Sequence, residues 1–173
     1  MRLVTVVLPG LLSLTVSGCG YHTAGHVKTL PEDIHTIAVP AFINQSRTYR
    51  VEQRLTAAVV RELVTRTNYH VVNEPDQAAD ATLQGIVLGT VAVPATYDSQ
   101  TGRAASVLVA VTVKVSLTDR HGKVLYDNPS YAFRDQYQVS RELSSFFEEG
   151  SPAWERLCRE FARSLVSNLL EGF

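Results

Sequence analysis

The stretch Val107–Thr118, VLVAVTVKVSLT, decides the fold because two kinds of residue alternate along it. Valine or leucine fills every odd-numbered position, while the even-numbered positions are mostly small or polar, with Lys114 the one charge. Successive side chains of a β-strand point to opposite faces, so this period of two predicts a long strand with one buried face. Such a face needs a second layer of structure to cover it.

Shorter runs rich in β-branched residues predict further strands on both sides of this one. They are expected at residues 34–40, 69–72, 81–93, 124–126 and 131–139. Proline has no N–H to give to a sheet, so Pro94 is expected to end the third run and Pro129 to separate the last two. The turn at residues 119–123 predicts a hairpin after the valine-rich strand.

Two other segments carry apolar residues at helical spacing. The first covers residues 49–66, and its N-cap is expected to be Ser46 or Thr48. The second opens at Ser151 and Pro152, a capping residue followed by a first-turn proline. Its apolar stripe consists of Trp154, Leu157, Cys158, Phe161, Leu165 and Leu169. These elements predict an α+β fold: a two-layer sandwich in which a mixed sheet of about four to five strands carries both amphipathic helices on one face.

The composition is that of one folded domain. Of the 173 residues, 45% are hydrophobic and 19% are charged. The formal net charge of −1 lacks the basic excess that phosphate-backbone binding requires, so no nucleic-acid partner is expected. Cys158 lies within the apolar stripe of the second helix, and we interpret it as a small buried hydrophobe.

The first nineteen residues, MRLVTVVLPGLLSLTVSGC, have the layout of a secretory signal. Arg2 supplies the positive start, and an apolar run follows to Val16. A lasting membrane span needs about 20 consecutive apolar residues, which this run does not reach. The segment is therefore expected to be removed rather than to remain as an anchor.

The end of this segment, Val16–Cys19, resembles a bacterial lipobox. That resemblance implies cleavage before Cys19, with a diacylglyceryl group on its thiol and an acyl chain on its amine; several acyl chains give stable membrane anchoring. The alternative is an ordinary signal peptide with a cysteine at its boundary. The expected organisation is a signal peptide at 1–18, a lipidated tether at 19–33 and a single domain at 34–173.

Known catalytic and cofactor motifs are missing from the sequence. There is no Gly-x-Ser-x-Gly elbow, no phosphate-binding loop and no dinucleotide fingerprint. His22 and His26 stand four apart, but in a glycine-containing tether without an acidic or cysteine partner, so no metal site is expected. We expect no cofactor beyond the covalent lipid on Cys19, and no enzyme.

With these elements in order, the chain resembles the lipopolysaccharide-assembly lipoprotein family LptE over nearly its whole length. The resemblance rests on several short segments in a fixed order. They are Gly18–His22, Leu30–Pro31, Ile37–Pro40, Phe42–Asn44, Ala78–Ala81, Leu83–Gly85, the valine-rich strand and the turn at Asp119–Leu125.

The resemblance implies an outer-membrane lipoprotein that forms a heterodimer with the LptD β-barrel, plugs its lumen and binds lipopolysaccharide during transport. The domain would face the periplasm or the barrel lumen. The family binds lipopolysaccharide with basic side chains, partly near the central hairpin, which points here to Arg103, Arg120 and Lys123. All three are expected in exposed turns, where the alternative is a solvated charge.

Two other function classes remain open from the sequence. One is an envelope lipoprotein of similar build that activates a peptidoglycan synthase or serves another envelope complex, since IAVPAF followed by a helix is similar to segments of such proteins. The other is an envelope hydrolase, which is supported only by isolated serine and histidine residues. Co-purification with a large β-barrel would separate the first from the LptE interpretation.

Overall fold

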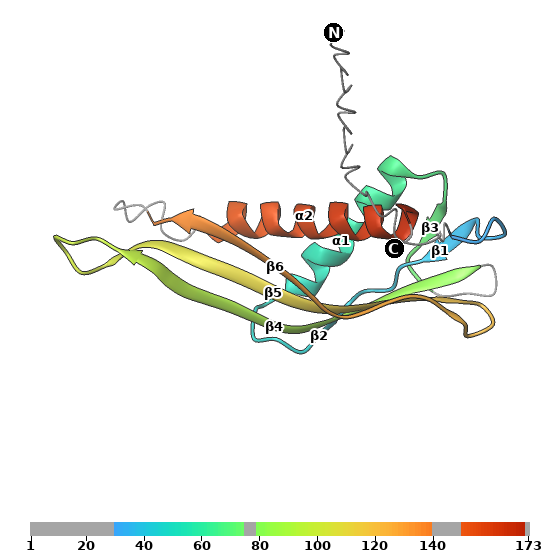
Figure 1. The fold of residues 1–173 in the computed structure, drawn as a ribbon, viewed down its shortest axis with the longest axis horizontal. Helices are drawn as coiled ribbons and strands as arrows, with labels where there is room; N and C mark the ends of the chain where they lie inside the picture. Colours follow the sequence, from blue (N-terminus) through green and yellow to red (C-terminus); the bar gives the residue numbers. More distant parts are fainter. Residues whose placement is uncertain (1–29, 75–78, 140–149, 172–173) are drawn as a thin grey trace, which may run out of the picture.

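The structure, a computed structural model, describes residues 30–74, 79–139 and 150–171 (Figure 1). The expected signal peptide and most of the expected tether, including Cys19, lie outside these residues. The elements follow in the order β1 (Thr36–Ala38), β2 (Ile43–Asn44), α1 (Val51–Arg66), β3 (His70–Val72), β4 (Ala81–Tyr97), β5 (Ala104–Asp119), β6 (Val124–Gln138) and α2 (Gly150–Glu171).

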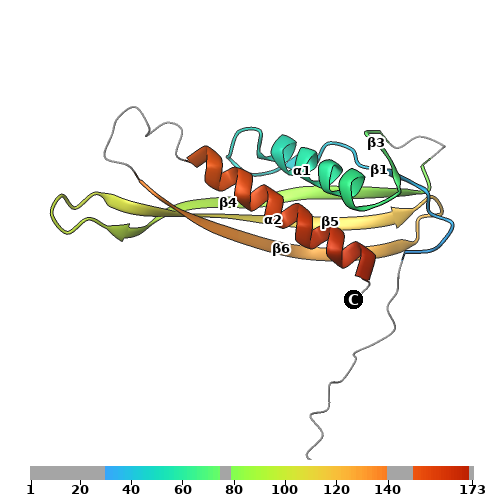
Figure 2. The same ribbon diagram turned by 90° about the horizontal axis from the view of Figure 1, so that it is seen from above.

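The molecule is a two-layer sandwich with both helices on one face of a mixed sheet (Figures 1 and 2). The strand order is β3-β1-β4-β5-β6, and β2 also pairs with β4. β1 is parallel to β3 and β4, whereas β4, β5 and β6 form an antiparallel meander. The α+β fold expected from the sequence is confirmed.

The alternation in β5 sets which face of the sheet is covered. All odd-numbered residues from Val109 to Leu117 are at most 1% exposed, because they lie under the helices. On the other face, Lys114 is exposed. The valine-rich strand is therefore the floor of the core, as its period of two predicts.

Phe161 on α2 is the centre of the core above this floor. Its ring makes edge contacts with Phe42, Tyr131 and Phe133, at centroid distances of 6.4, 5.8 and 5.5 Å. Edge-to-face packing of this kind adds to the free energy of burying the rings. The predicted stripe of α2 is buried from Leu157 to Leu169, while Trp154 is only half-buried.

Three expectations about the strands and caps are wrong. β4 continues through Pro94 to Tyr97, because β4 is an edge strand there, where proline is tolerated, and a register shift follows Pro94. β6 runs unbroken through Asp127–Pro129, with a register shift absorbing the irregularity. The N-cap of α1 is Arg50, which has a left-handed φ of 55° and no capping side-chain bond. Ser46 and Thr48 bond within the preceding turn instead.

Candidate functional site

The β4–β5 hairpin projects beyond the helical layer (Figures 1 and 2). β1 pairs with β4 only near Ala81, and β2 only near Ile86 and Val87. A hydrogen bond between the hydroxyls of Thr48 and Thr90, 2.7 Å apart, is the last contact of this kind on this side among the described residues. From Val91 to Tyr97 the outer edge of β4 has no partner strand within the part of the chain that the structure describes.

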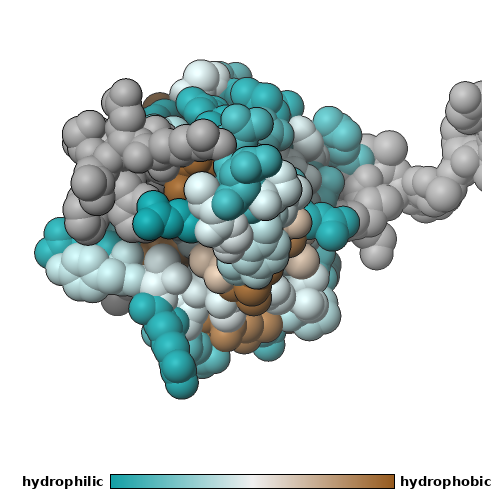
Figure 3. Space-filling model, turned by 90° about the vertical axis from the view of Figure 1, so that its left-hand side faces the viewer, coloured by the Kyte–Doolittle hydropathy of each residue, from teal (hydrophilic) through white to brown (hydrophobic). Residues whose placement is uncertain are grey.

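This free edge is apolar and carries no charge. No charged residue occurs between Asp80 and Asp98. Val91, Val93 and Tyr97 are 50%, 43% and 66% exposed, although residues of their size are usually covered. Seen from the hairpin end, apolar surface lies on the side of the sheet away from the helices (Figure 3). An exposed apolar edge of this kind marks an interaction surface.

A polar network fixes the hairpin on the face of the sheet opposite the buried valines. The hydroxyl of Ser106 lies 2.7 Å from that of Thr96 and accepts a 2.8 Å bond from Nε2 of Gln136. These three residues stand on β4, β5 and β6, and Ser106 is 4% exposed. The network joins all three strands just before the tip, so the projecting part keeps its shape without helices over it.

Arg103, a predicted lipopolysaccharide contact, lies at the tip of this hairpin. The Asp98 carboxylate accepts hydrogen bonds from the N–H groups of Gln100 and Thr101, and Gly102 turns the chain at a φ of +67°. Arg103 then enters β5 with its side chain exposed. It makes no ion pair among the residues that the structure describes.

Arg120, the second predicted contact, is tied to the fold. Its guanidinium pairs with the carboxylate of Asp80, whose side chain is 11% exposed. The other oxygen of Asp80 accepts 2.8 Å bonds from the N–H groups of His35 and Thr36. The ion pair therefore joins the β5–β6 turn to the start of β1, and Arg120 has a structural role that its turn position did not suggest.

Lys123, the third predicted contact, follows a tightly bonded turn. Oδ1 of Asp119 accepts from the N–H of His121 at 2.8 Å and of Lys123 at 2.9 Å. The bond from Lys123 is the main reason that the pKa of Asp119 is lowered. The side chain of Lys123 is exposed and forms no ion pair within the described part of the chain.

The structure does not bring the three predicted basic residues together. Arg103 precedes the first residue of β5 and Arg120 follows its last. Sixteen residues of strand separate them, about 50 Å at 3.3 Å per residue. A ligand contact at Arg103 is therefore distinct from one at Lys123. The sequence analysis had placed the two residues in one candidate site.

The described residues contain no cluster of side chains suited to hold a metal ion. Nowhere among them do three or more histidine, cysteine or acidic side chains lie so that they could share a metal ion. His22 and His26 lie outside the described residues. Burial raises the pKa of Cys158 to about 11, which keeps its thiol protonated and unreactive. No helix in the described ranges is long and apolar enough to span a bilayer.

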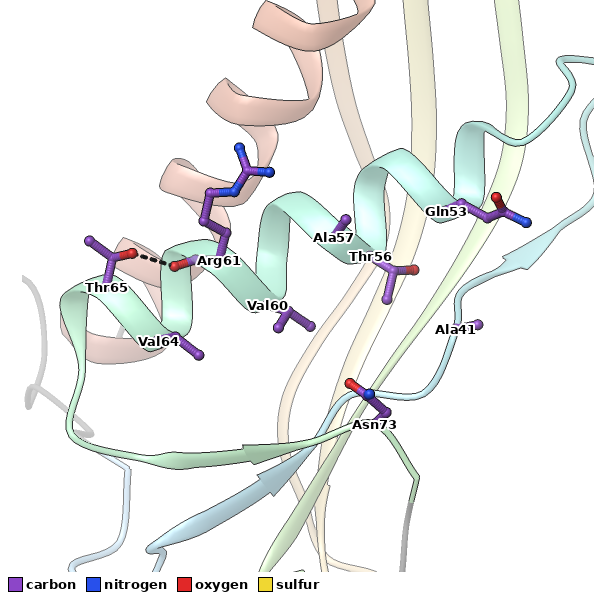
Figure 4. A pocket seen from close by; sticks show the side chains of 9 residues that line it. All are labelled: Ala41, Gln53, Thr56, Ala57, Val60, Arg61, Val64, Thr65 and Asn73. Atoms are coloured by element: carbon purple, nitrogen blue, oxygen red, sulfur yellow. Dashed lines mark hydrogen bonds between the residues drawn. The ribbon is translucent and has the colours of Figure 1, made fainter.

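A hollow of about 560 Å³ lies on the flank of α1 that faces away from α2. Val60 and Val64 point into it, with Ala41 and Asn73 on the opposite wall (Figure 4). Arg61 rises from α1 in the other direction. The exposed surface of this hollow is mainly apolar.

The comparison with protein families decides the assignment. The model of the family described as "LptE: Lipopolysaccharide-assembly" matches residues 34–169. The chain belongs to the LptE family. This agrees with the resemblance found in the sequence, and it supports a lipoprotein of lipopolysaccharide assembly. A comparison with curated proteins gave no match.

Solved structures share the fold of this LptE family member at low sequence identity. Rare lipoprotein B from Shewanella oneidensis is 14% identical, with 78% of this chain and 92% of that chain covered and a TM-score of 0.55. Uncharacterized lipoprotein B from Nitrosomonas europaea is 12% identical, with 82% and 89% covered and a TM-score of 0.51. PelC from Paraburkholderia phytofirmans is 15% identical, with 81% and 90% covered and a TM-score of 0.51. These likenesses establish the fold only.

Sequence reasoning missed the free edge of β4. It expected the strand to stop at Pro94 and looked for charged residues near the hairpin. The signal was present in the seventeen uncharged residues from Ala81 to Tyr97, which exceed the length that the core can cover. A strand that is much longer than the strands on one side of it, as β4 is compared with β1 and β2, has an unpaired edge beyond their ends.

Proposed function

We propose that this chain is an outer-membrane lipoprotein that plugs and helps assemble an LptD-type β-barrel and binds lipopolysaccharide on its way to the cell surface. The observation that carries the proposal is the family match over 34–169. The acyl chains on Cys19 hold the domain at the periplasmic side of the membrane, where the body reaches the barrel lumen. No catalytic step is assigned to the chain.

The barrel contact is assigned to the projecting β4–β5 hairpin. Its free edge presents the exposed side chains of Val91, Val93 and Tyr97, and its tip extends past the helices, so the hairpin can reach into a barrel lumen ahead of the rest of the domain. Burying exposed apolar side chains stabilises a complex by roughly 25 cal/mol per Å². The lack of charge means that little desolvation cost opposes this burial.

Lipopolysaccharide binding is assigned first to Arg103, because its guanidinium is exposed at the hairpin tip and can bind a lipid A phosphate through two N–H groups. Lys123 is a second candidate at the far end of β5. Arg120 takes part only if a ligand replaces Asp80 as its partner. Its contribution to binding is therefore expected to be the smallest of the three.

A pull-down tests the partner. The tagged full-length chain is extracted in detergent, and proteins that co-purify are identified by mass spectrometry. We expect a large β-barrel with the wild type, and a several-fold lower yield with Val91→Ser/Val93→Ser/Tyr97→Ser. Val64→Ser/Val124→Ser alters side chains that are 59% and 58% exposed elsewhere, and it serves as the control. Recovery of a peptidoglycan synthase in place of a barrel would overturn the proposal.

Anchoring has its own test. Cys19→Ala is expected to abolish labelling by palmitate and to shift the protein out of the outer-membrane fraction. Labelling that persists in this variant would show that the lipid is attached elsewhere.

A further inference from the structure

A groove between α1 and α2 is lined by more arginines than residues of any other type. It has a volume of about 430 Å³, and four of its ten lining residues are Arg54, Arg61, Arg159 and Arg163. Three alanines and Cys158 are among the other lining residues, and these small side chains leave the hollow between the helices unfilled. We call this feature the arginine groove.

The helices run side by side so that their arginines face one another. Arg66 near the end of α1 donates to the hydroxyl of Ser167 on α2 at 2.9 Å, and Arg54 near the start of α1 lies close enough to Cys158 to affect its thiol. Figure 2 shows both helices crossing the sheet in similar directions. The spacing of seven residues between Arg54 and Arg61 places both on one face of α1.

The positive charge of the groove is poorly compensated. Within the described parts of the chain, Arg54, Arg61 and Arg159 form no ion pair. The groove's two acids are Glu62 and Glu155, and Glu62 is already paired with Arg66 at 3.5 Å. The fourth arginine, Arg163, has only a loose 3.5 Å contact with Glu160 outside the groove. A chain with a net charge of −1 thus gathers four cations around one hollow.

We infer that the arginine groove binds a phosphate group carried by a small headgroup. Guanidinium groups present N–H pairs that match two phosphate oxygens at once. A phosphate monoester carries up to two negative charges, and a diphosphate carries more. Either group therefore suits several arginines better than a single carboxylate does. The size of the hollow leaves room for a sugar or a second phosphate beside the bound group.

This site is separate from the hairpin of the proposed function. The tip of the β4–β5 hairpin projects beyond the helical layer, whereas the groove lies between the helices. Loss of barrel binding would therefore leave phosphate binding at the groove unchanged, and the reverse also holds.

Calorimetric titration of the full-length protein in detergent with inorganic pyrophosphate tests the site. We expect Arg61→Gln/Arg159→Gln to weaken binding about tenfold or more, since each charge-assisted bond contributes that order of affinity. The control, Arg47→Gln/Arg134→Gln, removes the same charge from exposed arginines outside the groove and is expected to change affinity by less than twofold. Because all four side chains are exposed, both variants are expected to fold, which a thermal melt checks.

A second arm distinguishes a lipid headgroup from free phosphate. The wild type and both variants are titrated with intact lipopolysaccharide and with lipopolysaccharide treated with phosphatase. If the headgroup is the ligand, the groove variant loses affinity for the intact form only; if free phosphate is the ligand, it loses affinity for pyrophosphate alone. No pyrophosphate binding by the wild type at millimolar concentration together with equal lipopolysaccharide binding by both variants would overturn the inference, as would equal losses in groove and control variants.

Discussion

The guanidinium of Arg120 pairs with the carboxylate of Asp80, forty residues earlier in the chain. The backbone N–H of Arg120 also donates to the carbonyl oxygen of Asp80 at 2.9 Å. Because Asp80 holds the first residues of β1 as well, these two residues close the end of the sheet where β1, β4 and the β5–β6 turn meet.

Replacing Arg120 is therefore expected to destabilise the protein. Arg120→Ala leaves a mostly buried carboxylate without its cation, and we expect a loss of about 1–3 kcal/mol in the free energy of unfolding. Lys123→Ala, three residues on, is the control and is expected to change it by less than about 0.5 kcal/mol. Urea melts measure both. Equal small effects would mean that the Asp80–Arg120 pair contributes nothing to the fold.

The backbone of Gly85 lies against the ring of Phe42. A Cβ at position 85 would overlap that ring, whereas a Cβ at Gly89 would meet nothing within 4 Å. Because Phe42 also touches Phe161 and has little room to move, Gly85→Ala is expected to cost about 1–3 kcal/mol. Gly89→Ala in the same strand is expected to be nearly neutral. Thermal denaturation of the two variants compares them, and a neutral Gly85→Ala would contradict the packing.

Phe161 joins the two layers through three other rings. Phe161→Ala is expected to lower the free energy of unfolding by about 3–5 kcal/mol, as large aromatic truncations in packed cores do. Arg156, on the exposed side of the same helix, bonds Asp135 at 2.9 Å. Because that pair is solvent-exposed, Arg156→Ala is expected to cost no more than about 1 kcal/mol. Chemical denaturation that gave similar losses for both would contradict the orientation of α2.

The Asp119 turn is expected to lose stability in acid. The N–H bonds from Lys123 and His121 lower the pKa of Asp119 below its ordinary value of 3.8, so the folded state favours the ionised form. This contribution is complete above the ordinary pKa and disappears as pH falls through the lowered one. Asp119→Asn keeps an acceptor oxygen without the charge. The difference in melting temperature between wild type and variant should shrink from pH 5 to about pH 2.5; a constant difference would exclude this titration.

Local patterns were enough to predict the layers of the fold. The alternation in β5 and the apolar stripe of α2 around Phe161 each indicate a buried face. One face of a strand contains every second residue, and one face of a helix contains every third or fourth residue. The two-residue strand Ile43–Asn44 was missed because its pairing with β4 is tertiary and its own sequence is too short to carry a period.

The candidate sites were harder to predict for a related reason. Which charges are free depends on partners far along the chain: Arg120 looks like Lys123 in the sequence, but only Arg120 meets Asp80. The arginine groove joins residues about a hundred positions apart, and the free edge of β4 is defined by where its neighbouring strands stop. The groove leaves no local signal, and the free edge is indicated in the sequence only by the long uncharged run from Ala81 to Tyr97.

The strand order also gives the chain a sequence of assembly. β4, β5 and β6 pair with their neighbours across short turns, whereas β1 must find β4 after α1 and β3 have been made. Because closing a short loop costs less entropy than closing a long one, the meander is expected to form first and the parallel strands later. The buried valine face of β5 is then expected to stay open to water until α2, the last element that the structure describes, packs over it. The interval before α2 packs on this face is therefore when the sheet is expected to be most exposed to wrong partners.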